Sequence, residues 1–268
     1  MHLKRALITG ASSGLGEEFA RQLARREVNL ILTARRKDLL ENLAAELTST
    51  FGIGVEIVVA DLTDTKDVSK VVKAIETHPD LDLLINNAGF GVPGHYYDKD
   101  FQRELDMLNV HVMAVNHLTR AALQNMVPKR HGAIINVSSV AGFGPTFSSS
   151  NYCATKAYLI RFSEGLALEL KPHNVAVQVL CPGYTHTGFH STPEYVNRFN
   201  KSSIPKFAWL SSRFVVARSL QALDRGKVVV VPGWGYSFLA WFAGTALYRI
   251  LLRLVYHTIM KAKHRRVD

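Results

Sequence analysis

Short apolar runs alternate with longer segments of helical periodicity along most of this chain. The runs of strand length are residues 3–9, 29–33, 55–60, 83–86, 133–138, 175–181 and 228–231. The helical patterns are residues 16–26, 37–48, 65–77, 100–125, 152–171 and 212–224. Continuous apolar strands separated by helices are typical of a parallel sheet that is covered on both faces. We therefore predict an α/β fold with a doubly wound, Rossmann-like parallel sheet.

The pattern changes near Trp234, where apolar and aromatic residues become almost continuous up to Met260. Polar residues recur there at steps of four and form one narrow stripe: Thr245, Arg249, Arg253, His257 and Lys261. This change predicts a single catalytic domain over residues 1–235, followed by an amphipathic helical extension over residues 236–268.

The extension has three possible environments. Two arginines limit its uninterrupted apolar helix to roughly twelve residues, fewer than the ~20 that cross a bilayer. A broad apolar face with a basic stripe is typical of a helix at a membrane surface, and the Lys261-x-Lys263-His264-Arg265-Arg266 end strengthens that interpretation. The alternatives are a helix packed in a dimer interface or against its own domain, and, with the least support, a true span.

Composition excludes several classes of protein. With 268 residues, 47% hydrophobic and 20% charged, the chain can bury a large core and is not extensively disordered. Cys153 and Cys181 provide no disulfide framework, and the 11 histidines form no metal-binding pattern, so we expect no metal. His111 and His117 need no functional explanation.

Charge and the N-terminal sequence bear on location. The net charge is +10, of which residues 249–268 contribute +5. The chain runs directly into its first strand, so we expect no signal peptide and a cytoplasmic protein, with possible peripheral attachment to a membrane surface. The basic tail has no accompanying nucleic-acid-binding motif, so we expect no nucleic-acid partner.

A glycine-rich turn joins the first predicted strand to the first helix. Its sequence is Thr9-Gly10-Ala11-Ser12-Ser13-Gly14-Leu15-Gly16. Glycines in such a turn allow backbone N–H groups at a helix N-terminus to approach a phosphate. The spacing G-x-x-x-G-x-G only approximates the usual G-x-G-x-x-G fingerprint, so the strand–turn–helix context carries the prediction of a dinucleotide site.

Two arginines follow the second strand and favour NADP(H). An NAD-specific site usually has Asp or Glu about twenty residues beyond the glycine turn, to bind the ribose 2′-hydroxyl. This chain has Arg35 and Arg36 after Ala34, and a guanidinium group suits a 2′-phosphate better. The alternative is that both arginines lie on a solvated helix start.

Tyr152 and Lys156 are four residues apart on a predicted helix, and Ser139 lies thirteen residues before the tyrosine. This spacing places Tyr and Lys on one helix face. A nearby ammonium group is expected to lower the pKa of the phenol, so that it can exchange protons nearer neutral pH. A serine hydroxyl beside them could hydrogen-bond a substrate oxygen.

Taken together, the motifs resemble the classical short-chain dehydrogenase/reductase family. The matching residues, from Thr9 to about Gly233, are the glycine turn, Asp61-Leu62, Asn86-Asn87-Ala88-Gly89, Asn109, Ser139, Tyr152-x-x-x-Lys156 and Pro182-Gly183-Tyr184-Thr185-His186-Thr187. The resemblance implies a catalytic set of Asn109, Ser139, Tyr152 and Lys156, with the substrate oxygen held by Ser139 and Tyr152. It also implies a homodimer or homotetramer.

The resemblance implies further roles for these residues. Tyr152 would be the acid/base, Lys156 would lower its pKa and hold the nicotinamide ribose, and Asn109 would place a water in a proton relay. The implied cofactor-binding residues are Gly10, Ser12, Ser13, Gly14, Leu15, Gly16, Arg35, Arg36, Asp61, Leu62, Asn87, Ala88, Gly89, Tyr152, Lys156, Pro182, Gly183, Thr185 and Thr187.

The substrate is less closely defined. Residues 188–210, the variable lid of the resembled family, carry several aromatic and apolar residues: Phe189, Tyr195, Phe199, Ile204, Pro205, Phe207 and Trp209. They suggest a hydrophobic ketoacyl, steroid-like or aromatic carbonyl or alcohol substrate, although they could equally be ordinary helix packing. The predicted function is an NADP(H)-dependent oxidoreductase. The alternative is a non-catalytic NADP(H)-binding sensor or scaffold.

Overall fold

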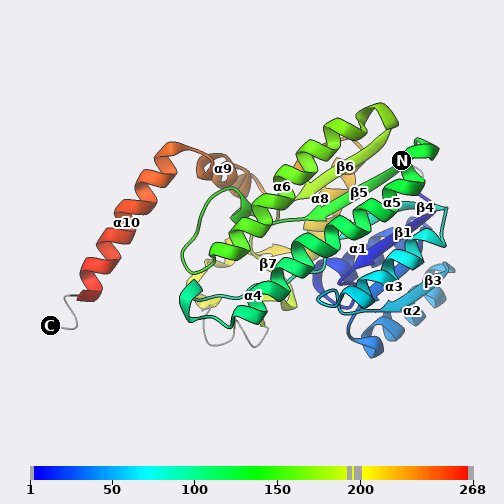
Figure 1. Cartoon of the computed structure of the whole chain (residues 1–268), viewed down its shortest axis with the longest axis horizontal. Coiled ribbons are helices and arrows are strands. Elements are labelled where there is room, and N and C mark those ends of the chain that lie inside the picture. Colours follow the sequence, from blue (N-terminus) through cyan, green and yellow to red (C-terminus); the bar gives the residue numbers. More distant parts are fainter. Residues whose placement is uncertain (1–2, 192–194, 196–200, 265–268) are drawn as a thin grey trace.

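The structure, a computed structural model, describes residues 3–191, 195 and 201–264. Its main sheet has seven strands in the order β3-β2-β1-β4-β5-β6-β9, and every neighbouring pair is parallel (Figure 1). The strands are β1 (Arg5–Thr9), β2 (Asn29–Ala34), β3 (Val55–Val59), β4 (Leu81–Asn86), β5 (Gly132–Val137), β6 (Val175–Leu180) and β9 (Val229–Val230). This confirms the predicted doubly wound α/β fold.

Helices cover both faces of the sheet. One face carries α1 (Gly14–Ala24), α2 (Lys37–Phe51) and α8 (Ser212–Leu223). The other carries α3 (Thr65–Glu76), α5 (Val115–Lys129) and α6 (Ser150–Leu170). Alternate residues of β1 serve the two layers, because Ile8 packs with the first group and Leu7 with the second. The sheet is therefore buried on both sides, as its continuous apolar strands predict.

The predicted helix over residues 100–125 is three segments. They are α4 (Phe101–Leu108), a π-helical stretch η2 (Asn109–Ala114) and α5, which extends to Lys129. Periodicity does not distinguish these segments, because one wider turn shifts the facing residues by only a fraction of a turn. The π segment lies beside the candidate site, since its His111 contacts α6.

Several short segments that the sequence pattern does not predict connect the main helices and strands. Strands β7 (Thr185–His186) and β8 (Leu210–Ser211) form a small parallel sheet. The remaining short turns are η1 (Tyr96–Asp98), η3 (Val140–Gly142), η4 (Lys171–His173), η5 (Gly188–Ser191), η6 (Lys201–Ser203) and η7 (Lys206–Ala208). Phe199 of the predicted lid lies outside the described residues.

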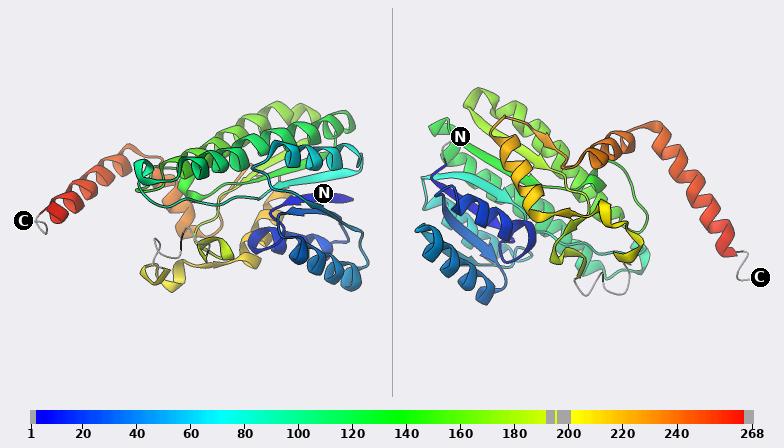
Figure 2. Two further views of the ribbon diagram at one scale, coloured as in Figure 1. Left: turned by 60° about the horizontal axis from the view of Figure 1, so that its bottom comes forward. Right: turned by 180° about the vertical axis from the view of Figure 1, so that it is seen from behind.

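The C-terminal extension is present, but it consists of two helices. They are α9 (Trp234–Ala243) and α10 (Ala246–His264). The angle between α9 and the first part of α10, Ala246–Val255, is 87°. In the described part of the chain, neither helix alone is long and apolar enough to cross a membrane, whereas the bent pair together meets the length and composition test. Figures 1 and 2 show α10 projecting away from the body. Arg265 and Arg266 of the predicted basic end lie outside the described residues.

Helix α9 begins before the predicted division at residues 235 and 236, so the division falls inside a helix. The Tyr236 hydroxyl donates to the Ala208 carbonyl at 2.6 Å and accepts from the Tyr184 N–H at 3.1 Å. The first turn of α9 is therefore attached to loops at the sheet's carboxyl edge.

Candidate functional site

A cavity of about 1170 Å³ lies at the carboxyl ends of the central strands. All predicted site residues line it except Gly16 and Asn109. The lining residues come from the loops after β1, β2, β3, β4, β5 and β6, which meet at one edge because the strands are parallel. Its lining includes the glycine turn, Tyr152 and residues of α9.

The glycine turn is shaped by close backbone contacts. Gly10 and Gly14 have φ values of +66° and +64°, a region that other residues rarely adopt. A Cβ at Gly16 would collide with the carbonyl oxygen of Gly10. Gly16 therefore serves the site from behind the turn, by allowing α1 to start against it. The N–H groups of the first helical turn have no partners within the helix, so they can receive a phosphate.

Hydrogen bonds join the ends of β1 and β4 beside this turn. The Thr9 hydroxyl accepts from the N–H groups of Asn87 and Ala88, both at 2.9 Å. The Asn87 amide donates back to the Thr9 carbonyl at 2.8 Å. These bonds give Asn87 a structural function in addition to its position in the cavity wall, and they fix the two loops relative to each other.

Arg35 and Arg36 lie at the exposed end of the cavity. Arg36 Nη2 donates to the hydroxyls of Ser12 and Ser13, at 2.9 and 2.8 Å. Arg35 is 65% exposed, and its Nη1 is 3.7 Å from Asp61 Oδ2. Two guanidinium groups and two serine hydroxyls thus converge where the second strand ends. This donor set suits a phosphate monoester.

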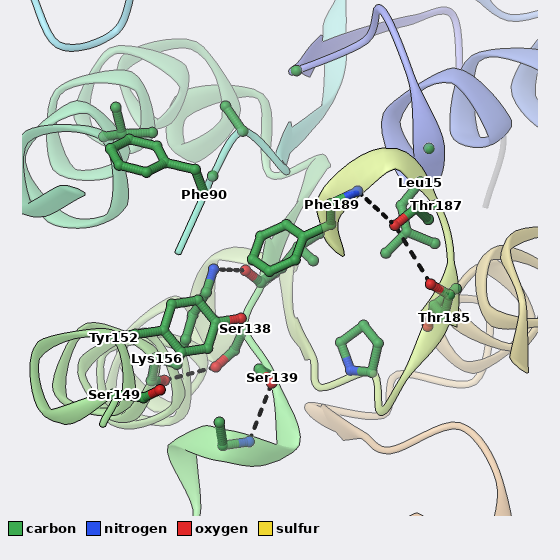
Figure 3. A pocket seen from close by; sticks show the side chains of 18 of the residues that line it. Leu15, Phe90, Ser138, Ser139, Ser149, Tyr152, Lys156, Thr185, Thr187 and Phe189 are labelled. Carbon is green, nitrogen blue, oxygen red and sulfur yellow. Dashed lines mark hydrogen bonds between the residues drawn. The ribbon is translucent and has the colours of Figure 1, made fainter. Parts of the chain in front are cut away.

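Ser139, Tyr152 and Lys156 lie close together in the cavity wall (Figure 3). Ser139 lies after β5, and its hydroxyl accepts from the Ala141 N–H at 3.1 Å. Lys156 is 4% exposed, and its Nζ donates to the Val137 carbonyl at 2.9 Å. The same Nζ is 5.7 Å from the centre of the Tyr152 ring. The Ser138 hydroxyl donates to the Lys156 carbonyl at 2.7 Å, and this bond joins the loop after β5 to α6.

The ionisation of this group differs from the sequence-based expectation. Burial raises the pKa of Tyr152 to about 12, and a hydrogen bond with Ser139 only partly opposes this. Burial also lowers the pKa of Lys156 to about 8. Desolvation therefore determines the pKa of Tyr152, and the expected lowering of the phenol pKa by Lys156 is not found in this structure. Tyr152 is a protonated donor at neutral pH.

Asn109 is not part of this arrangement. It is the first residue of the π segment, and its amide nitrogen is 3.5 Å from the Thr63 carbonyl, a long hydrogen bond. It does not line the cavity. The structure thus brings together three of the four predicted catalytic residues. A relay function for Asn109 stays a prediction.

His111 is a part of the site for which we expected no function. Its Nε2 accepts from the Phe90 N–H at 3.2 Å, so in the neutral ring Nδ1 carries the proton and donates to the Thr155 hydroxyl at 2.9 Å. The ring lies edge-on to Tyr152, with 5.9 Å between ring centres. Burial and the charge of Lys156 hold the pKa of His111 well below its usual value. Its position two residues after Asn109 was the available signal, but only folding brings α6 opposite it.

The other end of the cavity is lined by aromatic and apolar residues. Phe189 lies 6.1 Å from Tyr152 between ring centres and 5.5 Å from Tyr195, so part of the predicted lid contacts the catalytic group. Leu239 and Ala243 of α9 also line the cavity. Tyr248 of α10 lines it too, and its hydroxyl donates to the Pro145 carbonyl at 2.9 Å. The extension therefore forms part of the wall.

The described residues fit a dinucleotide but offer no metal cluster. Gly14 packs so closely against the Thr187 side chain that a Cβ would lie 3.1 Å from it, and both residues line the cavity. Together with the arginine pair, the glycine turn suits a phosphorylated dinucleotide. Among the residues that the structure describes, we find no group of three or more His, Cys, Asp or Glu side chains that could hold a metal ion.

Comparison with known proteins identifies the family. Residues 4–194 match the model of the short chain dehydrogenase family. The chain belongs to this family of oxidoreductases. Among solved structures, it is similar to a short-chain dehydrogenase from Sphingobium yanoikuyae in complex with NADPH, with a TM-score of 0.81 and 32% identity, covering 97% of this chain and 96% of that one.

Several curated proteins are also similar. A very-long-chain 3-oxoacyl-CoA reductase of Anas platyrhynchos is 34% identical over 186 residues, covering 68% of this chain and 60% of that protein. An NADP-dependent 3-hydroxy acid dehydrogenase of Schizosaccharomyces pombe is 32% identical over 236 residues, covering 85% and 90%. An inactive hydroxysteroid dehydrogenase-like protein of Homo sapiens is 29% identical over 195 residues, covering 72% and 59%. The chain thus spans about 60% of the length of the first of these relatives.

Proposed function

We propose that this protein is an NADP(H)-dependent oxidoreductase that interconverts a carbonyl and a secondary alcohol on a hydrophobic substrate. The observation that carries the proposal is the meeting of Ser139, Tyr152 and the buried Lys156 in the cavity that also contains the glycine turn. A family fold alone would not imply turnover. A tyrosine with its proton held by burial, beside a serine hydroxyl, is suited to proton transfer.

Tyr152, Ser139 and Lys156 each have a separate function in the proposed reaction. When bound, the nicotinamide supplies the hydride chemistry. In reduction, the protonated Tyr152 hydroxyl donates its proton to the substrate oxygen, which becomes an alcohol. The Ser139 hydroxyl holds and polarises that oxygen. Lys156, with its pKa near 8, places positive charge beside the phenolate that forms.

Cofactor preference is proposed to depend on the arginine pair. Arg35 and Arg36, with Ser12 and Ser13, would bind the 2′-phosphate that distinguishes NADP(H) from NAD(H). The NADPH complex of the similar Sphingobium protein and the name of the Schizosaccharomyces relative support this. Asp61 would contact the adenine ring, and Thr185 and Thr187 would lie near the carboxamide and phosphates.

The proposed substrate class follows from the apolar end of the cavity. Phe189, Leu239 and Tyr248 provide apolar and aromatic surface there. A ketoacyl, steroid-like or aromatic ketone would place its carbonyl at Tyr152 and its apolar part along these residues. The names of the relatives, which include a 3-oxoacyl-CoA reductase, agree with this class.

The second candidate is a non-catalytic NADP(H)-binding sensor or scaffold. The similarity to an inactive human protein is the observation that favours it. Against it, a pure binder has no physical need for the Tyr152, Ser139 and Lys156 arrangement. The two candidates differ in one outcome, because a binder should respond to NADPH without consuming it.

The test is NADPH oxidation, followed by absorbance, with 3-ketoacyl thioesters, steroids and aromatic ketones. We expect turnover with NADPH in preference to NADH, and a loss of roughly 10²- to 10⁴-fold in kcat for Tyr152→Phe. NADPH affinity of this variant, measured by fluorescence, should remain within about threefold, since the phenol hydroxyl contributes one hydrogen bond at most. Unchanged turnover in Tyr152→Phe would overturn the assignment, and binding without any turnover would favour the sensor.

The expected assembly follows the family resemblance. We propose a homodimer or homotetramer in the cytoplasm, with residues 1–235 as the catalytic domain and residues 236–268 as an extension that contacts a membrane surface. Light scattering of the full chain with and without NADPH measures the assembly. A monomer at all concentrations would contradict it.

A further inference from the structure

Helix α9 has its large aromatic residues on the outside. Ala240 and Ala243 are buried against the body, and Tyr236 on the same face bonds two loops. The opposite face carries three aromatic residues at positions i, i+4 and i+7, which are 90%, 62% and 67% exposed: Trp234, Phe238 and Trp241. An ordinary surface helix has the reverse arrangement, with its apolar stripe facing the core.

Helix α10 continues this exposed apolar surface. Its apolar residues have the spacing i, i+3, i+4, i+7 and i+8, which defines one helix face, and they are 42–57% exposed: Leu247, Ile250, Leu251, Leu254 and Val255. The helix projects from the body (Figure 2). Together, these residues and the three aromatic residues of α9 form what we term the outer face of the extension. An apolar surface of this extent on one side of a protein marks an interaction site.

Charge decides between the occupants that could cover the outer face. Arg249 and Arg253 are exposed on α10, and residues 249–268 carry a net charge of +5. A second copy would bring the same positive charge and offers no opposite charge to the extension. An anionic lipid surface offers the opposite charge together with an apolar layer, and each Lys or Arg near it strengthens binding.

The extension is also part of the active-site wall. Leu239 and Ala243 of α9, and Tyr248 of α10, line the cavity that holds Tyr152. The Tyr248 hydroxyl is bonded to Pro145, on the loop that follows Ser139. The side of the cavity formed by α9 and residues 144–149 is therefore continuous with the helix that carries the outer face.

We propose that α9 and α10 dock on an anionic lipid surface through the outer face, and that an apolar carbonyl substrate enters the cavity from that surface, past the wall formed by Leu239, Ala243 and Tyr248. The docking deepens the proposed contact of the extension with a membrane surface, and the entry route rests on the proposed oxidoreductase activity. Docking would shorten the path of a lipid-dissolved substrate to Tyr152. A substrate that is soluble in water would gain nothing from it.

Vesicle flotation of the full chain tests the docking. We expect binding to phosphatidylcholine vesicles that contain phosphatidylserine, and binding at least tenfold weaker to phosphatidylcholine alone. Arg249→Glu/Arg253→Glu should lose about tenfold or more in affinity for the anionic vesicles, and so should Trp234→Ser/Trp241→Ser. The matched controls are Arg225→Glu/Lys227→Glu, on the turn before β9, and Leu168→Ser on α6, which is 76% exposed. These controls should bind as the wild type does.

Turnover tests the substrate route separately. Anionic vesicles should raise kcat/KM for a long-chain ketone by about tenfold in the wild type, and should leave a short, water-soluble ketone unchanged. In Arg249→Glu/Arg253→Glu the gain should vanish, while turnover of the short ketone stays at the wild-type level. This second condition shows that the variant is folded and catalytic.

The outcomes are distinguishable. No flotation by the wild type, or equal flotation by all variants, would overturn the docking whatever the protein catalyses. Association of the chain through the extension in solution, abolished by Trp234→Ser/Trp241→Ser without any vesicle binding, would assign the outer face to a second copy and overturn it too. Vesicle binding with no acceleration of the long-chain ketone would overturn the entry route. Failure to oxidise NADPH with either ketone would instead contradict the proposed function.

Discussion

The two ends of the cavity are built from different kinds of contact. At the glycine turn, a Cβ on Gly16 would strike the Gly10 carbonyl oxygen, which belongs to the backbone. At the other end, a Cβ on Gly144 would lie 2.8 Å from the Tyr248 ring. Gly183 similarly faces the Tyr236 ring. The close contact at Gly16 is with backbone, whereas those at Gly144 and Gly183 are with tyrosine rings about 100 and 50 residues further along the chain.

The two kinds of neighbour predict different rigidity at the two ends of the cavity. A backbone neighbour cannot move without opening the turn, whereas a tyrosine side chain can rotate. We therefore expect the nucleotide end to be the more rigid of the two, and the proposed substrate end to adapt. Changes at the first end should alter NADPH affinity alone, and changes at the second should alter the KM of the ketone.

The largest expected effect at the nucleotide end is that of Gly16→Ala. The added methyl has no free volume, and relieving the clash costs about 3 kcal/mol, or roughly a hundredfold in NADPH affinity. Isothermal titration with NADPH measures it. Gly165→Ala on α6 is the control, because a Cβ there meets no atom within 4 Å and should slightly stabilise the helix. An NADPH affinity close to that of the wild type for Gly16→Ala would contradict the comparison.

The next effect concerns the phosphate donors. Removing both guanidinium groups in Arg35→Ala/Arg36→Ala should cost about 2–3 kcal/mol in NADPH binding, or roughly 30- to 100-fold. NADH binding should change by less than about threefold, since NADH has no 2′-phosphate. The ratio of the two dissociation constants is the measurement, with Arg218→Ala on α8 as control. Equal losses for both cofactors would remove the proposed phosphate contact.

His111 lies between the two ends and predicts a pH effect. Its pKa is lowered in the folded protein, so below about pH 6.5 the unfolded chain binds a proton that the folded one does not. Stability is therefore complete above that pH and falls as the pH drops, by on the order of 1 kcal/mol per unit for one proton. Thermal melting at pH 7.5 and 5.5 should show a smaller fall in His111→Gln than in the wild type.

The His111→Gln variant also tests whether His111 positions Tyr152 or only fills space in the core. Loss of the Phe90 and Thr155 bonds should lower kcat several-fold, because Thr155 and Tyr152 share a helix turn. NADPH affinity should change less than kcat. A parallel loss in both would indicate a general disturbance of the fold rather than positioning of Tyr152.

The smallest effect is expected at the substrate end. Tyr248→Phe removes the hydrogen bond to the Pro145 carbonyl, worth about 1 kcal/mol, and should raise the KM of a long-chain ketone by up to about fivefold. NADPH affinity should not change. Tyr158→Phe is the matched control, because its hydroxyl bonds Asn116 on α5 outside the cavity. An altered NADPH affinity in Tyr248→Phe would contradict the expectation that changes at the substrate end leave cofactor binding unchanged.

Sequence alone determined the fold class and most of the site. Apolar runs of strand length, alternating with helices, define a parallel sheet because strands and helices have distinct periods. The glycine turn, the arginine pair and the Tyr152–Lys156 spacing are local patterns. Parallel strands then bring their carboxyl-end loops to one edge without further information.

Tertiary structure decided what depends on distant neighbours. The high pKa of Tyr152 comes from burial by the whole cavity wall, and no spacing of residues reports burial. His111 became part of the site because η2 packs against α6, and Asn109 did not line the cavity although its motif predicted a catalytic function. The extension likewise has one face that lines the cavity and another that is exposed, since opposite faces of a helix meet different surroundings.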